Sequence, residues 1–103
     1  MNERRLSPRV AVEYPVRLKA KDSEGQSFRE ETLLENLSGS GSYLPLTRKL
    51  PEGAIVSMAM RLSTAPAGEG SMLMAARGIV RRVDSRADGG FGLAVQFIRR
   101  RIF

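Results

Sequence analysis

Residues 91–97 (FGLAVQF) decide the fold, because apolar side chains alternate strictly with small or polar ones along them. The apolar members are Phe91, Leu93, Val95 and Phe97. Successive side chains of a β-strand point to opposite faces, whereas one face of a helix recurs every three to four residues. The stretch therefore predicts a strand with one buried face.

The same period of two recurs through the chain. Residues 14–20 (YPVRLKA) and 54–62 (AIVSMAMRL) alternate in the same way. Further strands are expected at about 27–36, 43–46 and 72–83, with turns at 22–26, 38–42, 51–53 and 84–89 and a loop at 65–70. Gly78 lies in the middle of a long strand and predicts a bulge or bend. Six short strands separated by turns predict an all-β fold, a small antiparallel barrel or sandwich.

Length and composition set the limits. The chain has 103 residues and is 42% hydrophobic, which suits one domain with a buried core. It contains no cysteine and no histidine, which excludes disulfides, thiolate or imidazole metal sites and a Ser-His-Asp triad. The longest apolar stretch, 54–60, is far shorter than the roughly 20 residues of a membrane helix. The first ten residues lack the apolar core of a secretory signal. We expect a cytoplasmic protein without membrane insertion or bound metal.

The net charge of +6 is unevenly distributed. Residues 1–21 carry six basic and two acidic side chains, and residues 77–103 carry seven and two. Residues 22–76 carry four basic and seven acidic side chains. If the ends of the chain lie side by side, the fold presents a basic patch to an anion. On charge alone, solvated strand faces and coding bias are the favoured explanation of the arginines.

A first candidate site is residues 4–9 (RRLSPR), with the three guanidinium groups of Arg4, Arg5 and Arg9. Pro8 disfavours a helix and biases Ser7 towards extended geometry. A loop of this kind can close over an anion, and each guanidinium can bind a phosphate or a guanine edge through two hydrogen bonds. The alternative is a disordered basic terminus.

A second candidate site is residues 36–41 (NLSGSG). Asn36 and Ser38 share a face if they end a strand, and both can hydrogen-bond a base or a phosphate. Gly39 and Gly41 permit a positive φ and a close approach of the backbone to a ligand. The alternative is a serine or asparagine turn that closes a hairpin. The segment is not a phosphate-binding P-loop, because Gly-Lys-Ser/Thr is absent.

Signals for catalysis are poor. Glu30 and Glu31 would face opposite sides of one strand, and nothing indicates the cleft that a pair of catalytic carboxylates needs. Met58, Met60, Met72 and Met74 alternate on two strands, as core-filling residues do. Only 6% of residues are aromatic, which weakens any stacking platform for single-stranded nucleic acid. We expect no catalytic residue.

Taken together and in this order, the two motifs resemble the PilZ domain, a bacterial receptor module for cyclic di-GMP. That family has RxxxR in an N-terminal loop and [D/N]xSxxG on the barrel. Arg5 to Arg9 fits the first pattern and residues 36–41 fit the second. Residues 50–53, 77–83 and 92–97 also resemble the family, so the likeness covers about residues 3–98.

The resemblance implies a single domain over residues 1–103, built as a six-stranded antiparallel PilZ-type barrel. Its parts would be a flexible ligand-binding loop at 1–12, the barrel at 13–98 and a basic tail at 99–103. A C-terminal helix, which relatives often have, would be short or absent.

The resemblance also implies the site. Arg5 and Arg9 would bind the phosphates and the Hoogsteen edges of guanine, Asn36 and Ser38 would hold a guanine, and Gly41 would shape the turn. An arginine at the position of Arg4 goes with a stacked, intercalated pair of cyclic di-GMP molecules on one chain. No other cofactor is implied.

The function implied is a non-enzymatic receptor and adaptor. Ligand binding would change the conformation of the N-terminal loop and signal to an unidentified partner protein that controls motility, biofilm or exopolysaccharide synthesis. One alternative is a PilZ-like protein-interaction module that does not bind the nucleotide. A more distant alternative is a basic barrel that binds nucleic acid, which the modest charge and few aromatic residues disfavour.

Overall fold

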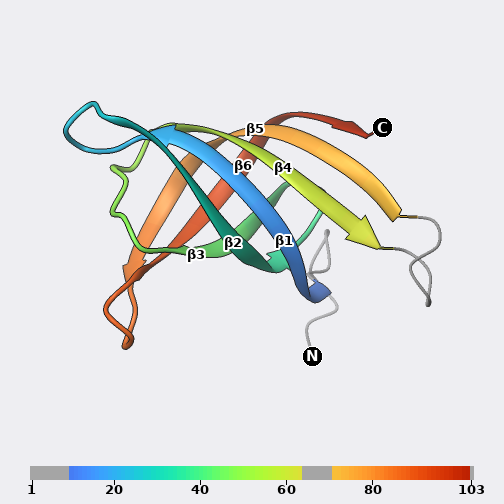
Figure 1. Ribbon diagram of the computed structural model, residues 1–103, viewed down its shortest axis with the longest axis horizontal. Helices are drawn as coiled ribbons and strands as arrows, with labels where there is room; N and C mark the ends of the chain where they lie inside the picture. Colours follow the sequence, from blue (N-terminus) through green and yellow to red (C-terminus); the bar gives the residue numbers. More distant parts are fainter. Residues whose placement is uncertain (1–9, 64–70, 103) are drawn as a thin grey trace.

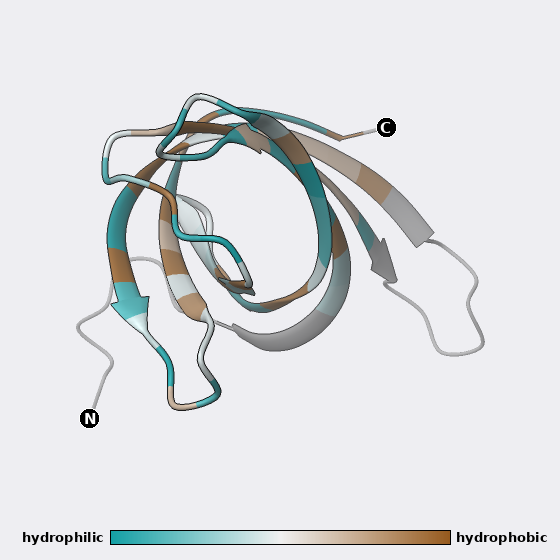
Figure 2. Ribbon diagram, turned by 60° about the vertical axis from the view of Figure 1, so that its left-hand side comes forward, coloured by the Kyte–Doolittle hydropathy of each residue, from teal (hydrophilic) through white to brown (hydrophobic). Residues whose placement is uncertain are grey.

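A computed structural model describes residues 10–63 and 71–102 (Figure 1). The strands are β1 (Val10–Lys21), β2 (Ser27–Leu37), β3 (Gly41–Leu46), β4 (Ile55–Ser63), β5 (Ser71–Ser85) and β6 (Phe91–Ile102). They pair antiparallel in the closed order β1-β2-β3-β6-β5-β4, and Figure 2 looks into the resulting ring. The predicted six-stranded antiparallel barrel is confirmed. The interpretations that concern residues 1–9 and 65–70 lie outside the described residues.

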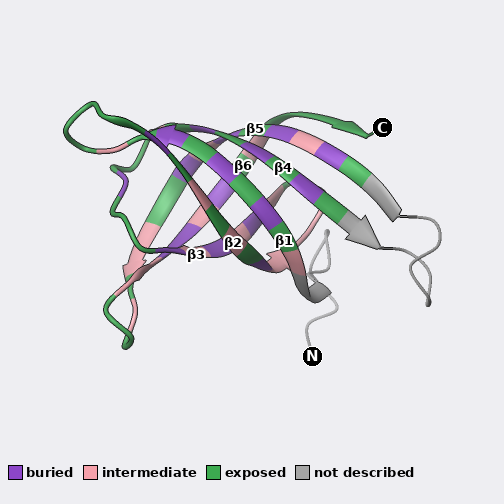
Figure 3. Cartoon of the chain, viewed as in Figure 1, coloured by how far each residue is buried: buried purple, intermediate pink, exposed green. Residues whose placement is uncertain are grey.

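The barrel is stabilised by the side chains that point inward, which are alternate residues along each strand (Figure 3). On β1, Val16 and Leu18 are buried while Arg17 between them is exposed. Burial of such a side chain contributes about 1.5–3 kcal/mol. The predicted core methionines Met58, Met60 and Met74 are all buried, and the Met72 side chain is outside the description.

The bulge predicted at Gly78 is present. The register of β5 against β6 shifts between Arg77 and Gly78 and again between Val80 and Arg82. A Cβ added to Gly78 would collide with the Val95 side chain, so glycine lets the two strands approach. A bulge increases the local bend and twist, which helps a long strand to follow a small barrel.

Two expected boundaries differ from the structure. Strand β6 does not end at residue 98 but runs to Ile102, and residues 99–102 pair with residues 74–77 of β5. They therefore form neither a separate basic tail nor a helix. Strand β1 starts at Val10, inside the expected loop. The last five side chains of β6 are exposed, so burial does not extend this strand. Backbone hydrogen bonds with the 15-residue β5 extend it, and the alternation of side chains does not reveal such bonds.

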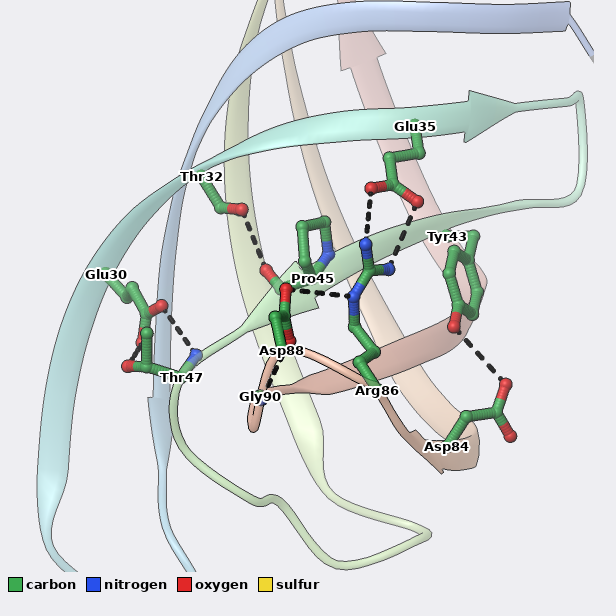
Figure 4. Close-up of polar contacts among 10 residues, drawn as sticks. All are labelled: Glu30, Thr32, Glu35, Tyr43, Pro45, Thr47, Asp84, Arg86, Asp88 and Gly90. Atoms are coloured by element: carbon green, nitrogen blue, oxygen red, sulfur yellow. Dashed lines mark hydrogen bonds and ion pairs between the residues drawn. The ribbon is translucent and has the colours of Figure 1, made fainter.

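Side chains supplement a short ladder between β2 and β3 (Figure 4). The paired residues are Asn36 with Tyr43 and Leu37 with Ser42. Farther along, the Thr32 hydroxyl donates to the Pro45 carbonyl at 2.8 Å. Glu30 accepts hydrogen bonds from the amide and the hydroxyl of Thr47, both at 2.8 Å. These bonds connect the two strands where Pro45 has no N–H to donate.

An ion pair holds the β5–β6 turn against β2. Both terminal nitrogens of Arg86 donate to the Glu35 carboxylate, at 3.3 and 3.2 Å, and Asp88 lies 3.8 Å from Arg86 Nε (Figure 4). The hydrogen bonds with Glu35 are the main cause that raises the pKa of Arg86 above its ordinary value. The turn is thereby tied to the neighbouring strand by a planar two-bond contact.

Residues 10–63 and 71–102 contain no helix with the length and hydrophobicity needed to cross a membrane.

Asp22 organises the turn between β1 and β2. One carboxylate oxygen accepts the amides of Glu24 and Gln26, both at 2.9 Å, and the other lies 3.2 Å from Arg48. The hydrogen bond from the Gln26 amide is the largest cause that lowers the pKa of Asp22 below its ordinary value of 3.8. Bonds to the charged form favour it over the protonated form.

We predict that Asp22 stabilises the fold in a pH-dependent way. Because its pKa is lower in the folded than in the unfolded state, its contribution is complete above 3.8 and is lost as the pH falls through the folded value. An NMR titration of the carboxyl carbon should give a midpoint below 3.8. The stability difference between the wild type and Asp22→Asn should shrink over the same range. A midpoint at or above the ordinary value would contradict this.

Candidate functional site

A hollow of about 230 Å³ lies where the β2–β3 hairpin meets β5 and β6. Its lining residues are Asn36, Leu37, Ser38, Ser40, Gly41, Ser42, Tyr43, Arg81, Ala94, Val95 and Gln96. Three of the residues singled out in the sequence, Asn36, Ser38 and Gly41, therefore lie together on one hollow. The three arginines of the N-terminal motif, Arg4, Arg5 and Arg9, lie outside the described residues.

Ser38 closes the hairpin. Its amide donates to the Gly41 carbonyl at 2.9 Å, and its hydroxyl accepts the Ser40 amide at 3.3 Å. The Phe97 amide in turn donates to the Ser40 carbonyl at 2.8 Å, which ties the hairpin to β6. The serine turn that the sequence offered as an alternative is thus present. It coexists with a place on the wall of the hollow.

Gly41 lacks the positive φ that the sequence suggested. The described glycines with a positive φ are Gly25, Gly53 and Gly89, and neither Gly39 nor Gly41 is among them. A Cβ on Gly41 would instead collide with the Val95 carbonyl oxygen. Glycine at this position lets the start of β3 lie directly on β6.

Asn36 presents an uncommitted amide to the hollow. It lies near the end of β2, pairs through its backbone with Tyr43, and is partly buried. Among the residues that the structure describes, its side chain makes no hydrogen bond. An amide offers two donors and an acceptor carbonyl to a ligand.

The structure adds Arg81 and Gln96, which sequence reasoning did not assign to the site. Arg81 Nε donates to Gln96 Oε1 at 2.6 Å across β5 and β6. Arg81 is the charged residue among the described residues that line the hollow, so it makes the site favourable for an anion. The sequence does not indicate which of the adjacent residues Arg81 and Arg82 faces the hollow, because the bulge in β5 changes the direction in which its side chains point.

Ser42 was also missed. It occupies an inward position of β3, in step with the buried Leu44 and Leu46, and it is 9% exposed. Its hydroxyl is buried without a hydrogen-bond partner among the described residues. The signal in the sequence was a serine at one of the alternating inward positions of this strand, where the other two residues are leucines. An unsatisfied hydroxyl in a core costs about 1–3 kcal/mol.

A second polar cluster lies beside the hollow. The Tyr43 hydroxyl donates to Asp84 at 3.3 Å, and Arg82 Nε donates to both oxygens of the same carboxylate at 3.1 and 3.2 Å. The Tyr43 ring covers Gly92, where a Cβ would collide with the tyrosine hydroxyl. The cluster fixes Tyr43, whose backbone pairs with Asn36 and so positions the end of β2.

The groups that line the hollow are suited to binding a ligand. It offers an amide, hydroxyl groups and one guanidinium, which suit a polar anionic ligand. The described residues contain no group of three or more acidic side chains arranged to hold a metal ion.

Replacement of Gly41 by alanine should destabilise the hairpin. The added methyl group would force β3 away from the Val95 carbonyl, and such overpacking costs about 1–3 kcal/mol. Urea unfolding measures the effect. Gly39→Ala is the matched control, because Gly39 is exposed and has no positive φ, and it should change stability by less than about 0.5 kcal/mol. Equal effects of the two substitutions would contradict the role of the close approach.

Comparison with solved structures places the barrel among known ones. The inhibitor of motility MotI/DgrA from Bacillus subtilis has a TM-score of 0.72 at 19% identity, and the match covers 93% of this chain and 43% of that one. The PilZ domain of YcgR from Escherichia coli, solved with c-di-GMP, has a TM-score of 0.56 at 15% identity, over 93% of this chain and 79% of that one. At these identities the likeness concerns the fold. No curated relative matches the sequence.

The sequence itself provides the assignment. The profile of the PilZ domain family matches residues 3–102, nearly the whole chain. The match includes both motifs and all six strands of the barrel. The chain therefore belongs to the PilZ domain family.

Proposed function

We propose that this protein is a non-enzymatic receptor for cyclic di-GMP that passes the signal to a partner protein. The observation that carries the proposal is the placement of Asn36, Ser38 and Gly41 on one hollow that also contains Arg81. Family membership supports the choice of ligand, and so does the c-di-GMP with which the E. coli PilZ domain was solved.

The chemistry of the ligand agrees with the residues. Cyclic di-GMP carries two phosphodiester charges and two guanines. Arg81 offers a positive charge, and the amide of Asn36 offers a donor and an acceptor for a base edge. In the proposal, Arg5 and Arg9 bind the phosphates and the N7 and O6 atoms of guanine, which match the guanidinium fork.

The signal itself is proposed to be a change in the N-terminal loop. Charge-assisted hydrogen bonds to the ligand would offset the entropy of ordering residues 4–9. The partner protein would then recognise the ordered loop and the adjacent barrel face. The Bacillus neighbour is an inhibitor of motility, and control of motility is one output that this proposal allows.

Arg5→Ala and Arg9→Ala should each reduce the affinity for cyclic di-GMP about 30-fold or more. This corresponds to about 2 kcal/mol for the loss of charge-assisted hydrogen bonds. Isothermal titration calorimetry measures the effect, with GMP as the ligand control. Tight binding of cyclic di-GMP without comparable binding of GMP is the expected result for the wild type.

Lys49→Ala is the control variant. It removes one positive charge from an exposed position outside the hollow and should leave the affinity unchanged within about twofold. If Arg5→Ala and Arg9→Ala bind like the wild type, the site assignment is wrong. If the wild type does not bind, the alternative of an interaction module without nucleotide gains the support.

Arg4→Ala should change the number of ligands bound more than the existence of binding. The proposal gives the wild type two stacked molecules per chain, because a third guanidinium offsets the doubled charge and can stack on a base. Calorimetry should therefore give a stoichiometry near two for the wild type and near one for the variant. The same stoichiometry in both proteins would refute this role of Arg4.

A further inference from the structure

Four exposed cations form one continuous row across five strands of the barrel. Arg29 pairs with Lys19, Lys19 with Ser57, Ser57 with Arg77, and Arg77 with Arg99. The row thus crosses β2, β1, β4, β5 and β6, and all its members are exposed. In Figure 1, β2, β1, β4 and β5 lie next to one another across the view. Strands lie about 4.8 Å apart, so the row extends roughly 20 Å over the surface.

No member of this row forms an ion pair within the described part of the protein, although Arg29 shares a small hollow with Glu30 and Glu31. The ion pairs formed among residues 10–63 and 71–102 involve Arg17, Arg48, Arg82 and Arg86, and none involves a member of the row. The acidic neighbour on β2, Glu31, is paired with Arg17 at 3.3 Å. Like charges on directly paired residues repel each other, at Arg29 and Lys19 and at Arg77 and Arg99. An external anion would relieve that repulsion.

The row also borders a concave surface. Ser57, Ala75, Arg77, Arg99 and Arg101 contribute to a hollow of about 330 Å³ over β4, β5 and β6. The residues between the arginines are small, so the backbone of a ligand can approach the sheet closely. This hollow shares no lining residue with the one at the β2–β3 hairpin.

We propose that this row binds the phosphodiester backbone of a nucleic acid, without sequence preference. Guanidinium and ammonium groups bind phosphate, and non-specific binding to a nucleic-acid backbone is driven almost entirely by charge. The members of the row are cations and one serine, so the row itself offers charge to a partner and no apolar or aromatic side chain, which favours a phosphodiester backbone. The row crosses five of the six strands of a closed barrel, so it turns with the barrel wall and a flat membrane would meet only part of it. A flexible strand of nucleic acid can follow the whole of it.

The modest net charge and the few aromatic residues disfavoured such a partner in the sequence, which could not show the row because its cations are scattered. Lys19, Arg29, Arg77 and Arg99 are separated by up to 80 residues, and no stretch of the chain shows them as a group. Antiparallel register brings them together. The scarcity of aromatic residues agrees with binding that has no sequence preference, because few side chains are available to stack on the bases.

The test is fluorescence anisotropy of labelled oligonucleotides of mixed sequence, single-stranded and duplex, titrated with the full chain over a salt series. Four phosphate contacts predict a slope of log K against log salt of about −3 to −4, which is about a 100-fold loss of affinity for a fourfold rise in salt. Lys19→Ala and Arg77→Ala should each reduce the magnitude of that slope by about one.

Two matched variants keep the test specific. Lys49→Ala removes an exposed lysine outside the row and should leave the slope unchanged, and Arg77→Lys should retain most of the affinity because it keeps the charge. The double variant of Arg5→Ala and Arg9→Ala should still bind the oligonucleotide. Circular dichroism verifies that each variant is folded without the use of cyclic di-GMP. Oligonucleotide binding is measured without that ligand, so failure of the receptor proposal and failure of this proposal are distinguishable.

Three results would overturn the proposal. The first is no binding of either oligonucleotide at low salt. The second is a slope that Lys19→Ala and Arg77→Ala do not change, or that Lys49→Ala changes equally. The third is binding to polyglutamate or to vesicles containing phosphatidylserine at protein concentrations where the oligonucleotides do not bind, which would assign the row to an acidic protein or to a membrane instead.

Discussion

The contact between Gly41 and the Val95 carbonyl is the constraint on which the proposed receptor site depends. It seats the start of β3 flat on β6, and no side chain larger than hydrogen fits between them. The hydrogen bond from Phe97 to Ser40 continues the contact into the turn. Because the hairpin is fixed in this way, Asn36 and Ser38 reach the same hollow as Arg81 and Gln96. The barrel thus positions groups from four strands around one small space.

Much of the fold was predictable because the alternation of side chains reflects burial directly. The inward residues of β1, β4 and β6 follow the expected pattern, and Gly78 marks the bulge. The extension of β6 to Ile102 was not predictable in the same way. Residues 99–102 have no buried face, and pairing of their backbone with β5 does not depend on side-chain type.

The candidate site was predictable in part, and for the same reason. Asn36, Ser38 and Gly41 are close in sequence, so a local motif reveals them. Arg81 and Gln96 come from other strands, and only the shifted register of β5 and β6 shows that they meet. The positive φ considered at Gly41 is absent, and the close contact with Val95 could not be predicted because Val95 lies on a strand distant in the sequence.

The central claim is that cyclic di-GMP binds at the β2–β3 hairpin. The most direct test is NMR, with amide and side-chain shifts recorded while the ligand is added to the labelled protein. The account predicts large changes at residues 36–41, at the Asn36 side-chain amide, at Arg81 and at Gln96, and small ones at Lys19 and Ser57 on the opposite wall. Changes confined to β1 and β4, or no changes at all, would contradict it.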